Sequence, residues 1–333
     1  MFPEKIEKSF ELTLEAIQLL QNALESSFLD AYIENAENMI DHFQVRVIDG
    51  VPNAETVKKV EAIYQQLQEI PLEAEEIRKL AQLLLLKGGK FEQLQPNHQL
   101  TPDGIGFLFV YLLEQLYPKK GDLTVLDISV GMGNLLLTVL LNLQNAGYRM
   151  KGYGVDIDET LLAVAAATSD WTHGEVQLFH QDGLQELLID PMDAVISDLP
   201  VGYYPHDEKA EKFLTAAKEN HSFAHHLLME QAMNYVKENS FGFFLVPSNF
   251  LETEQSQALK QLFIEKVYLQ AIIQLPDELF KNEVSRKSII ILQQKGEHAK
   301  QAEVLVAKLA TLKDSAKVAE FFKEFEAWKT ANL

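Results

Sequence analysis

The spacing of apolar residues divides the chain into two parts. From Glu4 to about Gln95 the sequence is rich in Leu, Glu, Gln and Ala, and apolar residues such as Ile17, Leu20 and Leu24 recur at helical spacing. This pattern predicts a helical N-terminal domain of four or five helices over residues 1–95, which packs, dimerises or holds a partner. A strand-like run at residues 44–48, followed by an Asp-Gly turn signal, is the exception.

The pattern changes near Pro96, and from Thr124 onward short β-branched runs alternate with helical stretches. Seven strands are predicted, at residues 124–128, 152–155, 176–179, 194–197, 242–246, 269–274 and 288–293. Helices are predicted at residues 134–144, 159–168, 223–237 and 255–266, and a last helical pattern covers residues 318–328. The alternation indicates an α/β domain over residues 96–333 with a doubly wound, mainly parallel sheet of seven strands. Nucleotide-like ligands bind such sheets at the carboxyl ends of the strands.

Composition narrows the chemistry. The 333 residues include 47% hydrophobic and 23% charged residues, as in ordinary globular proteins with room for two domains. The sequence has no cysteine, which excludes disulfides, thiolate metal sites and a cysteine nucleophile. No apolar run approaches the roughly 20 residues that span a membrane, and the N-terminus lacks a secretory pattern. We therefore expect a cytoplasmic protein without a membrane partner.

The charge balance is strongly acidic. Asp and Glu number 49 against 29 Lys and Arg, a formal net charge of −20, which repels polyanions at long range. A protein that grips bare DNA usually carries a basic face. The basic clusters here are small, at Lys119-Lys120 and at Arg286-Lys287 with Lys281 nearby.

A glycine-containing turn follows the first predicted strand. Asp127 ends that strand, and Gly131-Met132-Gly133-Asn134 leads into an apolar helix. Glycines let the backbone approach a ligand, and the N-terminus of the following helix offers unpaired N–H groups. A Gly-x-Gly turn without a ligand role is a common alternative when the motif stands alone.

A second acidic strand end strengthens the ligand interpretation. Asp156 follows Gly133 by 23 residues, close to the roughly 20-residue distance at which an acidic side chain receives ribose hydroxyls in nucleotide-binding α/β folds. Helix capping is the competing role for an aspartate here, and Asp158 is better placed for it. We therefore assign the ribose contact to Asp156 and the cap to Asp158.

The local residues favour S-adenosylmethionine over a dinucleotide. The dinucleotide fingerprint needs a small third residue, whereas this chain has Leu136 there. Asp127 would crowd a pyrophosphate, but it can face the ammonium group of a sulfonium cofactor. Gly88-Gly89-Lys90 is not a phosphate-binding loop, because it lacks the upstream glycine and the following Ser or Thr.

Two further strands end in acidic residues. Asp182 with Gly183 follows the third predicted strand, and Asp198 follows the fourth. Either aspartate alone can be a cap or turn residue. Together with Asp127 and Asp156 they place four acidic groups on one rim of a parallel sheet, which indicates a site.

These residues resemble the class I S-adenosylmethionine-dependent methyltransferases, and more closely the N6-adenine DNA methylases of the type I restriction-modification modification-subunit kind, over about residues 95–300. The resemblance implies methyl transfer to an amino group of a nucleic-acid base. It also implies that Thr101-Pro102 touches the methionine part of the cofactor, Ile157 lies beside the adenine, and Asp182 receives the adenine amino group. The expected cofactor residues are Thr101, Pro102, Asp127, Ser129, Gly131, Gly133, Asn134, Asp156, Ile157, Asp182, Gly183 and Asp198.

The catalytic loop departs from the family pattern. The family has Asn or Asp, Pro, Pro and an aromatic residue, where this chain has Asp198-Leu199-Pro200-Val201. In the family, the first side-chain oxygen and a backbone carbonyl accept hydrogen bonds from the target amino group, which positions it for transfer. Asp198 and the Leu199 carbonyl can do this. Val201 cannot stack on a flipped base, so the nearby Tyr203 and Tyr204 are candidates, with packing as the alternative role.

The resemblance also bears on partners. No long segment after residue 300 matches a sequence-reading domain, so we expect DNA or RNA to be bound with help from a partner subunit, and the helical domain to be a candidate homodimer surface. Two alternatives stay open: a cofactor-binding regulatory or interaction protein with little catalysis, and methylation of a protein or small molecule. His221, His225 and His226 are expected to be structural or surface residues, and no metal site is expected.

Overall fold

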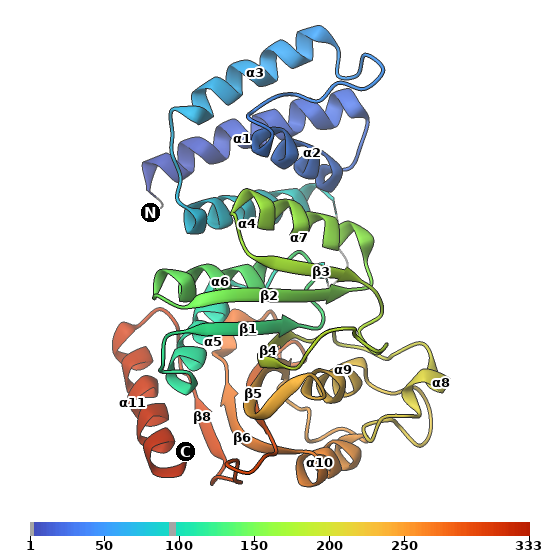
Figure 1. The fold of residues 1–333 in the computed structure, drawn as a ribbon, viewed down its shortest axis with the longest axis vertical. Helices are drawn as coiled ribbons and strands as arrows, with labels where there is room; N and C mark the ends of the chain where they lie inside the picture. The colour runs from blue at the N-terminus through green and yellow to red at the C-terminus, as the bar shows by residue number, and fades with distance from the viewer. Residues whose placement is uncertain (1–2, 93–97) are drawn as a thin grey trace.

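The structure, a computed structural model, describes residues 3–92 and 98–333; the predicted boundary between residues 95 and 96 lies outside these ranges. The N-terminal part is helical, as predicted, and lies at one end of the molecule (Figure 1). Its helices are α1 (Glu4–Leu24), α2 (Phe28–Ile40), α3 (Ala54–Gln68) and α4 (Ala74–Phe91).

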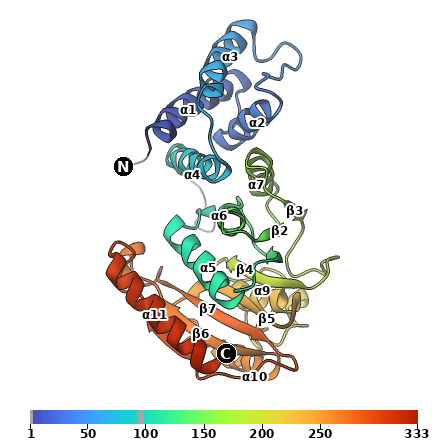
Figure 2. The same ribbon diagram turned by 60° about the vertical axis from the view of Figure 1, so that its left-hand side comes forward.

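Local signals start these helices and one apolar core joins them. The Ser27 side chain accepts from the N–H of Asp30 at the start of α2, in a capping box, and Asn53 caps α3. Buried apolar residues from all four helices pack together, and Leu161 and Val164 of α7 (Glu159–Trp171) belong to the same cluster. The helical part is therefore packed directly on the α/β part (Figure 2).

The strand predicted at residues 44–48 is wrong. Within this segment only Ile48 forms a bridge, to Val51 across the tight Asp49-Gly50 turn. The next hydrogen-bonded pair would join residues 46 and 53, but the Arg46 N–H donates to Asn38 Oδ1 and Asn53 caps α3. The turn signal was correct, but the residues around it leave no room for a strand.

The α/β part contains one mixed sheet. Its helices are α5 (Asp103–Leu116), α6 (Asn134–Asn145), α7, α8 (Asp207–Ala210), α9 (Ala224–Met233), α10 (Ser256–Glu265) and α11 (Ser315–Asn332). Its strands are β1 (Asp122–Asp127), β2 (Arg149–Asp156), β3 (Val176–His180), β4 (Met192–Asp198), β5 (Val236–Pro247), β6 (Val267–Gln274), β7 (Lys287–Gln294) and β8 (Leu305–Lys308). The strand order is β3-β2-β1-β4-β5-β7-β6-β8, with β7 antiparallel to both neighbours.

The structure confirms the doubly wound, mainly parallel sheet and adds to it. The predicted sheet had seven strands; the eighth, β8, pairs parallel with β6 at one edge. It has only four residues, alternately buried and exposed, and is too short to stand out in the sequence. The helix predicted at 223–237 ends at Met233, because Val236 already pairs with Met192 as the first residue of β5.

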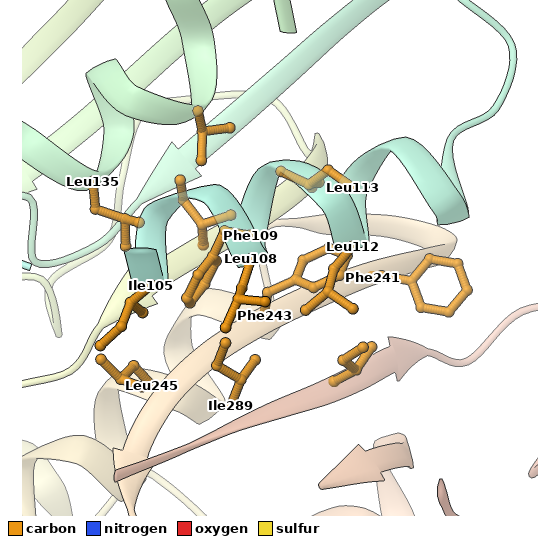
Figure 3. Close-up of a cluster of buried hydrophobic side chains, with 14 of the residues drawn as sticks. Ile105, Leu108, Phe109, Leu112, Leu113, Leu135, Phe241, Phe243, Leu245 and Ile289 are labelled. Atoms are coloured by element: carbon orange, nitrogen blue, oxygen red, sulfur yellow. The ribbon is translucent and has the colours of Figure 1, made fainter. Parts of the chain in front are cut away.

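Successive side chains of the central strands point to opposite faces of the sheet, and each face is covered by an apolar layer. On β5, Phe243 and Leu245 belong to the layer under α5, α6 and α11, whereas Phe244 and Val246 belong to the layer under α9 and α10. Figure 3 shows α5 lying over β5 and β7 with its apolar side chains between them. Because both faces are covered, ligands have access at the strand ends. None of the helices in the described ranges is both long and apolar enough to span a bilayer.

Candidate functional site

A cavity of about 440 Å³ lies at the carboxyl ends of β1 and β4. It is within the size range of small-molecule sites. We call it the central cavity. Its walls come from four segments, residues 98–105, 127–135, 198–201 and 279–287, with single contributions from Leu161, Leu245 and Pro247. Segments far apart in the sequence therefore meet at the edge where the fold places ligands.

The glycine turn forms one wall. Gly131 and Gly133 have positive φ angles of 52° and 80°, which favour glycine. A side chain on Gly131 would meet no atom within 4 Å, whereas one on Gly133 would come within 3.1 Å of Ala165. Gly131 thus leaves open space for a ligand and Gly133 permits close packing. Asn134 begins α6, and its Nδ2 donates to the Thr101 carbonyl at 2.7 Å, which ties the turn to the Thr-Pro element.

Asp127 is a buried acid at the end of β1. Its Oδ1 accepts from Ser197 Oγ at 2.6 Å and from the Ser129 N–H at 3.2 Å. Burial raises the pKa of Asp127 to about 7; the two hydrogen bonds oppose this rise, and the nearby charges of Asp198 and Asp156 add to it. A cation brought against this side chain would favour its ionised form.

This pKa predicts a pH dependence for cofactor binding. Because the pKa of Asp127 lies above its ordinary value, the neutral acid predominates below about pH 7 and the carboxylate above it. Calorimetric affinity for S-adenosylhomocysteine, which carries an ammonium group, should rise about tenfold between about pH 6 and about pH 8. The rise should flatten in Asp127→Asn; the same rise in both proteins would contradict the assignment.

Asp156 stands behind the glycine turn. Its Oδ2 accepts from the Gly131 N–H at 2.7 Å and its Oδ1 from the Asp158 N–H at 2.9 Å. An ionised carboxylate has about four acceptor positions, so two remain for hydroxyls. Asp158 caps α7 by accepting from the Leu161 N–H at 2.9 Å, which confirms the cap predicted for it.

Asp182 is bound by its own neighbours. Its Oδ1 accepts from the Leu184 N–H, and its Oδ2 accepts from Tyr204 Oη at 2.5 Å and Lys209 Nζ at 3.2 Å. Burial tends to raise the pKa of Asp182, but the hydrogen bonds outweigh it and hold the pKa below its ordinary value. Tyr204 is buried, so its ring is unavailable for stacking in this conformation.

Asp198 lies at the tip of β4 with both oxygens occupied. Thr101 Oγ1 donates to Oδ2 at 2.9 Å, and Lys287 Nζ, at the start of β7, contacts Oδ1. About one-fifth of each of the Asp198 and Lys287 side chains is exposed, and both line the central cavity. The carboxylate is therefore held between the Thr-Pro element and a lysine amine.

The residues after the catalytic loop form an aromatic cluster. Tyr203 is exposed and stacks on Phe223, with ring centroids 4.9 Å apart and planes 11° apart. His225 and His226 follow on α9 and are buried, with no hydrogen-bond partner for either ring among the described residues. Burial lowers the pKa of His225 to about 4 and of His226 to about 3, with Lys287 adding to the first shift and His225 to the second. Both rings are therefore neutral near pH 7.

The structure brings most of the predicted residues to the central cavity. Those that line it are Thr101, Pro102, Asp127, Ser129, Gly131, Asn134, Asp198, Leu199 and Pro200. Those that lie outside its walls are Gly133, Asp156, Ile157, Asp182, Gly183, Tyr203 and Tyr204. In the described ranges no group of three or more His, Asp or Glu side chains is placed to hold a metal ion.

The sequence did not indicate that two further residues, Lys287 and Arg78, belong to the site or support it. Lys287 was noted only as part of a small basic cluster with Arg286, and nothing in its spacing indicated Asp198 as its partner. Arg78 of α4 is 1% exposed and donates two hydrogen bonds to Asp103, two to Glu75 and one to Asn134 Oδ1. A helix outside the α/β part therefore holds the glycine turn and the start of α5.

Comparisons with known proteins agree with this geometry. The sequence model of the N-6 DNA Methylase family matches residues 95–331. The chain belongs to the N-6 DNA methylase family. A model of the YtxK N-terminal helical domain matches residues 7–89. The methylase is 39% identical over 320 residues to protein YtxK of Bacillus subtilis (strain 168), covering 96% of each chain.

Solved structures give the same result. A candidate class I S-adenosylmethionine-dependent methyltransferase from Listeria monocytogenes is 40% identical, with a TM-score of 0.90 over 98% of this chain and 99% of that one. The type I restriction-modification methyltransferase subunit of Streptococcus thermophilus, 13% identical, shares the fold with a TM-score of 0.66 over 95% and 74% of the two chains. This methylase is thus a class I S-adenosylmethionine-dependent methyltransferase with S-adenosylmethionine as its cofactor.

The residues present fit that cofactor. The open space over Gly131 admits a ligand against the backbone, and the carboxylates at the ends of β1, β2 and β4 suit ammonium, hydroxyl and amino donors. Ile157 is 67% exposed beside Asp156, an apolar side chain available to cover a flat ring. When bound, the cofactor supplies an electrophilic methyl group.

Proposed function

We propose that the methylase transfers a methyl group to an amino group of a DNA base. The observation that carries this proposal is the position of Asp198, at the tip of β4 and facing the central cavity beside Thr101. There its carboxylate and the Leu199 carbonyl accept hydrogen bonds from the target amino group and aim its lone pair at the methyl group. Pro200 stiffens the loop, because its ring fixes φ. The work of these groups is positioning.

We propose the remaining cofactor contacts from the same arrangement. Asp127 pairs with the ammonium group, and Thr101-Pro102 with Ser129, Gly131 and Asn134 surrounds the methionine part. Asp156 accepts ribose hydroxyls at the free positions of its carboxylate. Ile157, Asp182 and Gly183 contact the adenine, which requires Asp182 to accept a further donor beside Tyr204 and Lys209.

We propose that a partner subunit supplies the basic surface for DNA. The net charge of −20 repels a polyanion, and two of the basic residues that line the cavity are already paired: Lys287 with Asp198, and Arg286 with Asp277 and Glu283. We divide the chain into domains at 1–95 and 96–333 and assign the partner, or a second copy in a homodimer, to the helical domain. Sedimentation with and without partner tests the dimer.

Methyl transfer from labelled S-adenosylmethionine tests the proposal. The purified methylase, alone and with extract of its own cells to supply a partner, is offered unmethylated DNA, RNA and protein. Label in DNA that is lost in Asp198→Ala supports the proposal. If the cofactor binds but the label appears only in RNA or protein, that molecule and not DNA is the methyl acceptor. If the cofactor binds and none of the three is labelled, the result favours a regulatory protein.

We propose Tyr203 as the residue that stacks on the target base. Val201 has no aromatic ring and Tyr204 is buried, whereas Tyr203 is exposed. Tyr203→Ala should slow transfer to DNA by about tenfold to a hundredfold, since base stacking contributes roughly 1–3 kcal/mol. Tyr203→Phe keeps the ring and should retain most of the rate. Single-turnover rates measure this, and an alanine variant as fast as the wild type would remove Tyr203 from the site.

A further inference from the structure

We propose that the side-chain amine of Lys287 is itself a methyl acceptor, so that the protein methylates its own Lys287. The inference rests on the proposed function, because it uses the same cofactor and the same Asp198. It differs in the acceptor: an amine of this chain occupies the place assigned to the target amino group.

The contact at Asp198 carries the inference. The proposed role of this carboxylate is to accept a hydrogen bond from an amino group awaiting transfer, and the group found there is Lys287 Nζ. The other oxygen of the same carboxylate accepts from Thr101 Oγ1 at 2.9 Å, on the side assigned to the methionine part of the cofactor. The amine and the proposed methyl-donor position are therefore neighbours of one carboxylate.

The backbone fixes Lys287 in this place. Lys287 is the first residue of β7 and pairs with Pro247, the last residue of β5. The next residue, Ser288, shares a hydrogen bond of 2.9 Å with Ser248, the residue that follows the end of β5. An amine held on a paired strand beside the reacting position has a high effective concentration, on the order of 10⁵ M or more where the alignment is good.

The step balances without another reactant. Lys287 Nζ, as the neutral amine, forms a bond to the methyl carbon. The bond from that carbon to the sulfonium sulfur breaks, and its electron pair stays on sulfur as S-adenosylhomocysteine. The ammonium paired with Asp198 has no lone pair, so one proton first passes from it to Asp198 and then to water through the cavity rim, where Val201 and Val284 are exposed, and the product is a methylammonium ion. Each added methyl removes one of the three donors of the ammonium group, which loosens its contact with Asp198.

The fold contains an internal control. Asp193 lies near the other end of β4 and pairs with Lys237 of β5 at 2.6 Å, a lysine–aspartate pair away from the central cavity. Lys237 is more exposed than Lys287, at 49% against 23% of the side chain. Chemical alkylation in solution would favour Lys237, whereas transfer within the site selects Lys287.

Peptide mass spectrometry after incubation of the purified protein with S-adenosylmethionine tests the inference. We expect the Lys287 peptide to gain the mass of one or more methyl groups and the Lys237 peptide to gain none, with the gain lost in Lys287→Arg and Asp198→Ala. In the cofactor-free protein, an amine-acylating reagent should label Lys287 more slowly than Lys237, and Asp198→Ala should speed the labelling at Lys287.

Each other outcome overturns the inference in a distinguishable way. An unmodified Lys287 in protein shown by calorimetry to bind the cofactor overturns self-methylation and leaves methyl transfer to DNA standing. Equal gains at Lys287 and Lys237 indicate chemical alkylation. Acylation of Lys287 that is fast and indifferent to Asp198→Ala removes the contact from which the inference starts. If the protein does not bind the cofactor, both the proposed function and this inference are wrong.

Discussion

Replacing Asp198 with alanine is expected to lower the rate of methyl transfer about a hundredfold to a thousandfold. The carboxylate is the proposed acceptor for the target amino group, and removal of one such preorganised group in other enzymes has an effect of this size. The substitution also releases Thr101 and leaves the Lys287 ammonium without its partner. Single-turnover transfer at saturating cofactor measures the loss.

Asp198→Asn is the matched control for this prediction. Asparagine keeps a side-chain oxygen that accepts a hydrogen bond, and the resemblance to N6-adenine methylases allows either residue at this position. We expect the asparagine variant to retain far more of the rate than the alanine variant, and both to bind S-adenosylhomocysteine. Equal, small losses in the two variants would show that the β4 tip does not position the acceptor.

Replacing Arg78 with methionine is expected to lower the free energy of unfolding by about 3 kcal/mol. The guanidinium is almost fully buried and joins Glu75, Asp103 and Asn134, so its removal leaves two carboxylates and an amide oxygen without their donors. This loss of stability is at the lower end of the range for breaking a buried ion pair, because the two carboxylates are about one-fifth exposed to solvent. Denaturant unfolding followed by tryptophan fluorescence measures it.

The control is a more exposed ion pair that joins the same helix, α4, to α1. Lys5 of α1 pairs with Glu76 of α4 at 2.6 Å, and Lys5→Met should change stability by less than about 1 kcal/mol. Arg78→Met should also weaken cofactor binding, since Asn134 links Arg78 to Thr101, whereas Lys5→Met should leave it unchanged. Equal effects of the two variants on stability and binding would mean that Arg78 does not support the site.

The sequence predicted what depends on periodicity and on residues local to a strand end. The short, nearly continuous apolar runs of β4 and β5 follow from burial on both faces, and Asp127, Asp156 and Asp198 end the strands β1, β2 and β4 as expected. A rim of carboxylates at one edge could be predicted, because parallel strands share their direction. The order of the strands could not be predicted. It depends on pairs between residues far apart in the sequence, such as those that place β7 beside β5.

The sequence did not predict contacts between side chains from distant segments. Lys287 reaches Asp198 across 89 positions, and Arg78 reaches Asn134 across 56. Tyr204 was a candidate for stacking because of its nearness to the catalytic loop, but its hydroxyl donates to Asp182 and its ring is buried. Such pairings depend on how helices and strands pack against one another, and the spacing of residues within one segment does not predict that packing.

We propose that the ends of β1, β2 and β4 form one site for S-adenosylmethionine. Calorimetric titration of S-adenosylhomocysteine into the wild-type protein, Asp156→Ala and Asp158→Ala tests it most directly. We predict binding to the wild type, affinity at least about tenfold weaker in Asp156→Ala because hydrogen bonds to a charged acceptor are lost, and near wild-type affinity in Asp158→Ala, which loses only a helix cap. Equal affinity in the wild type and Asp156→Ala, or no binding to the wild type, would contradict the account.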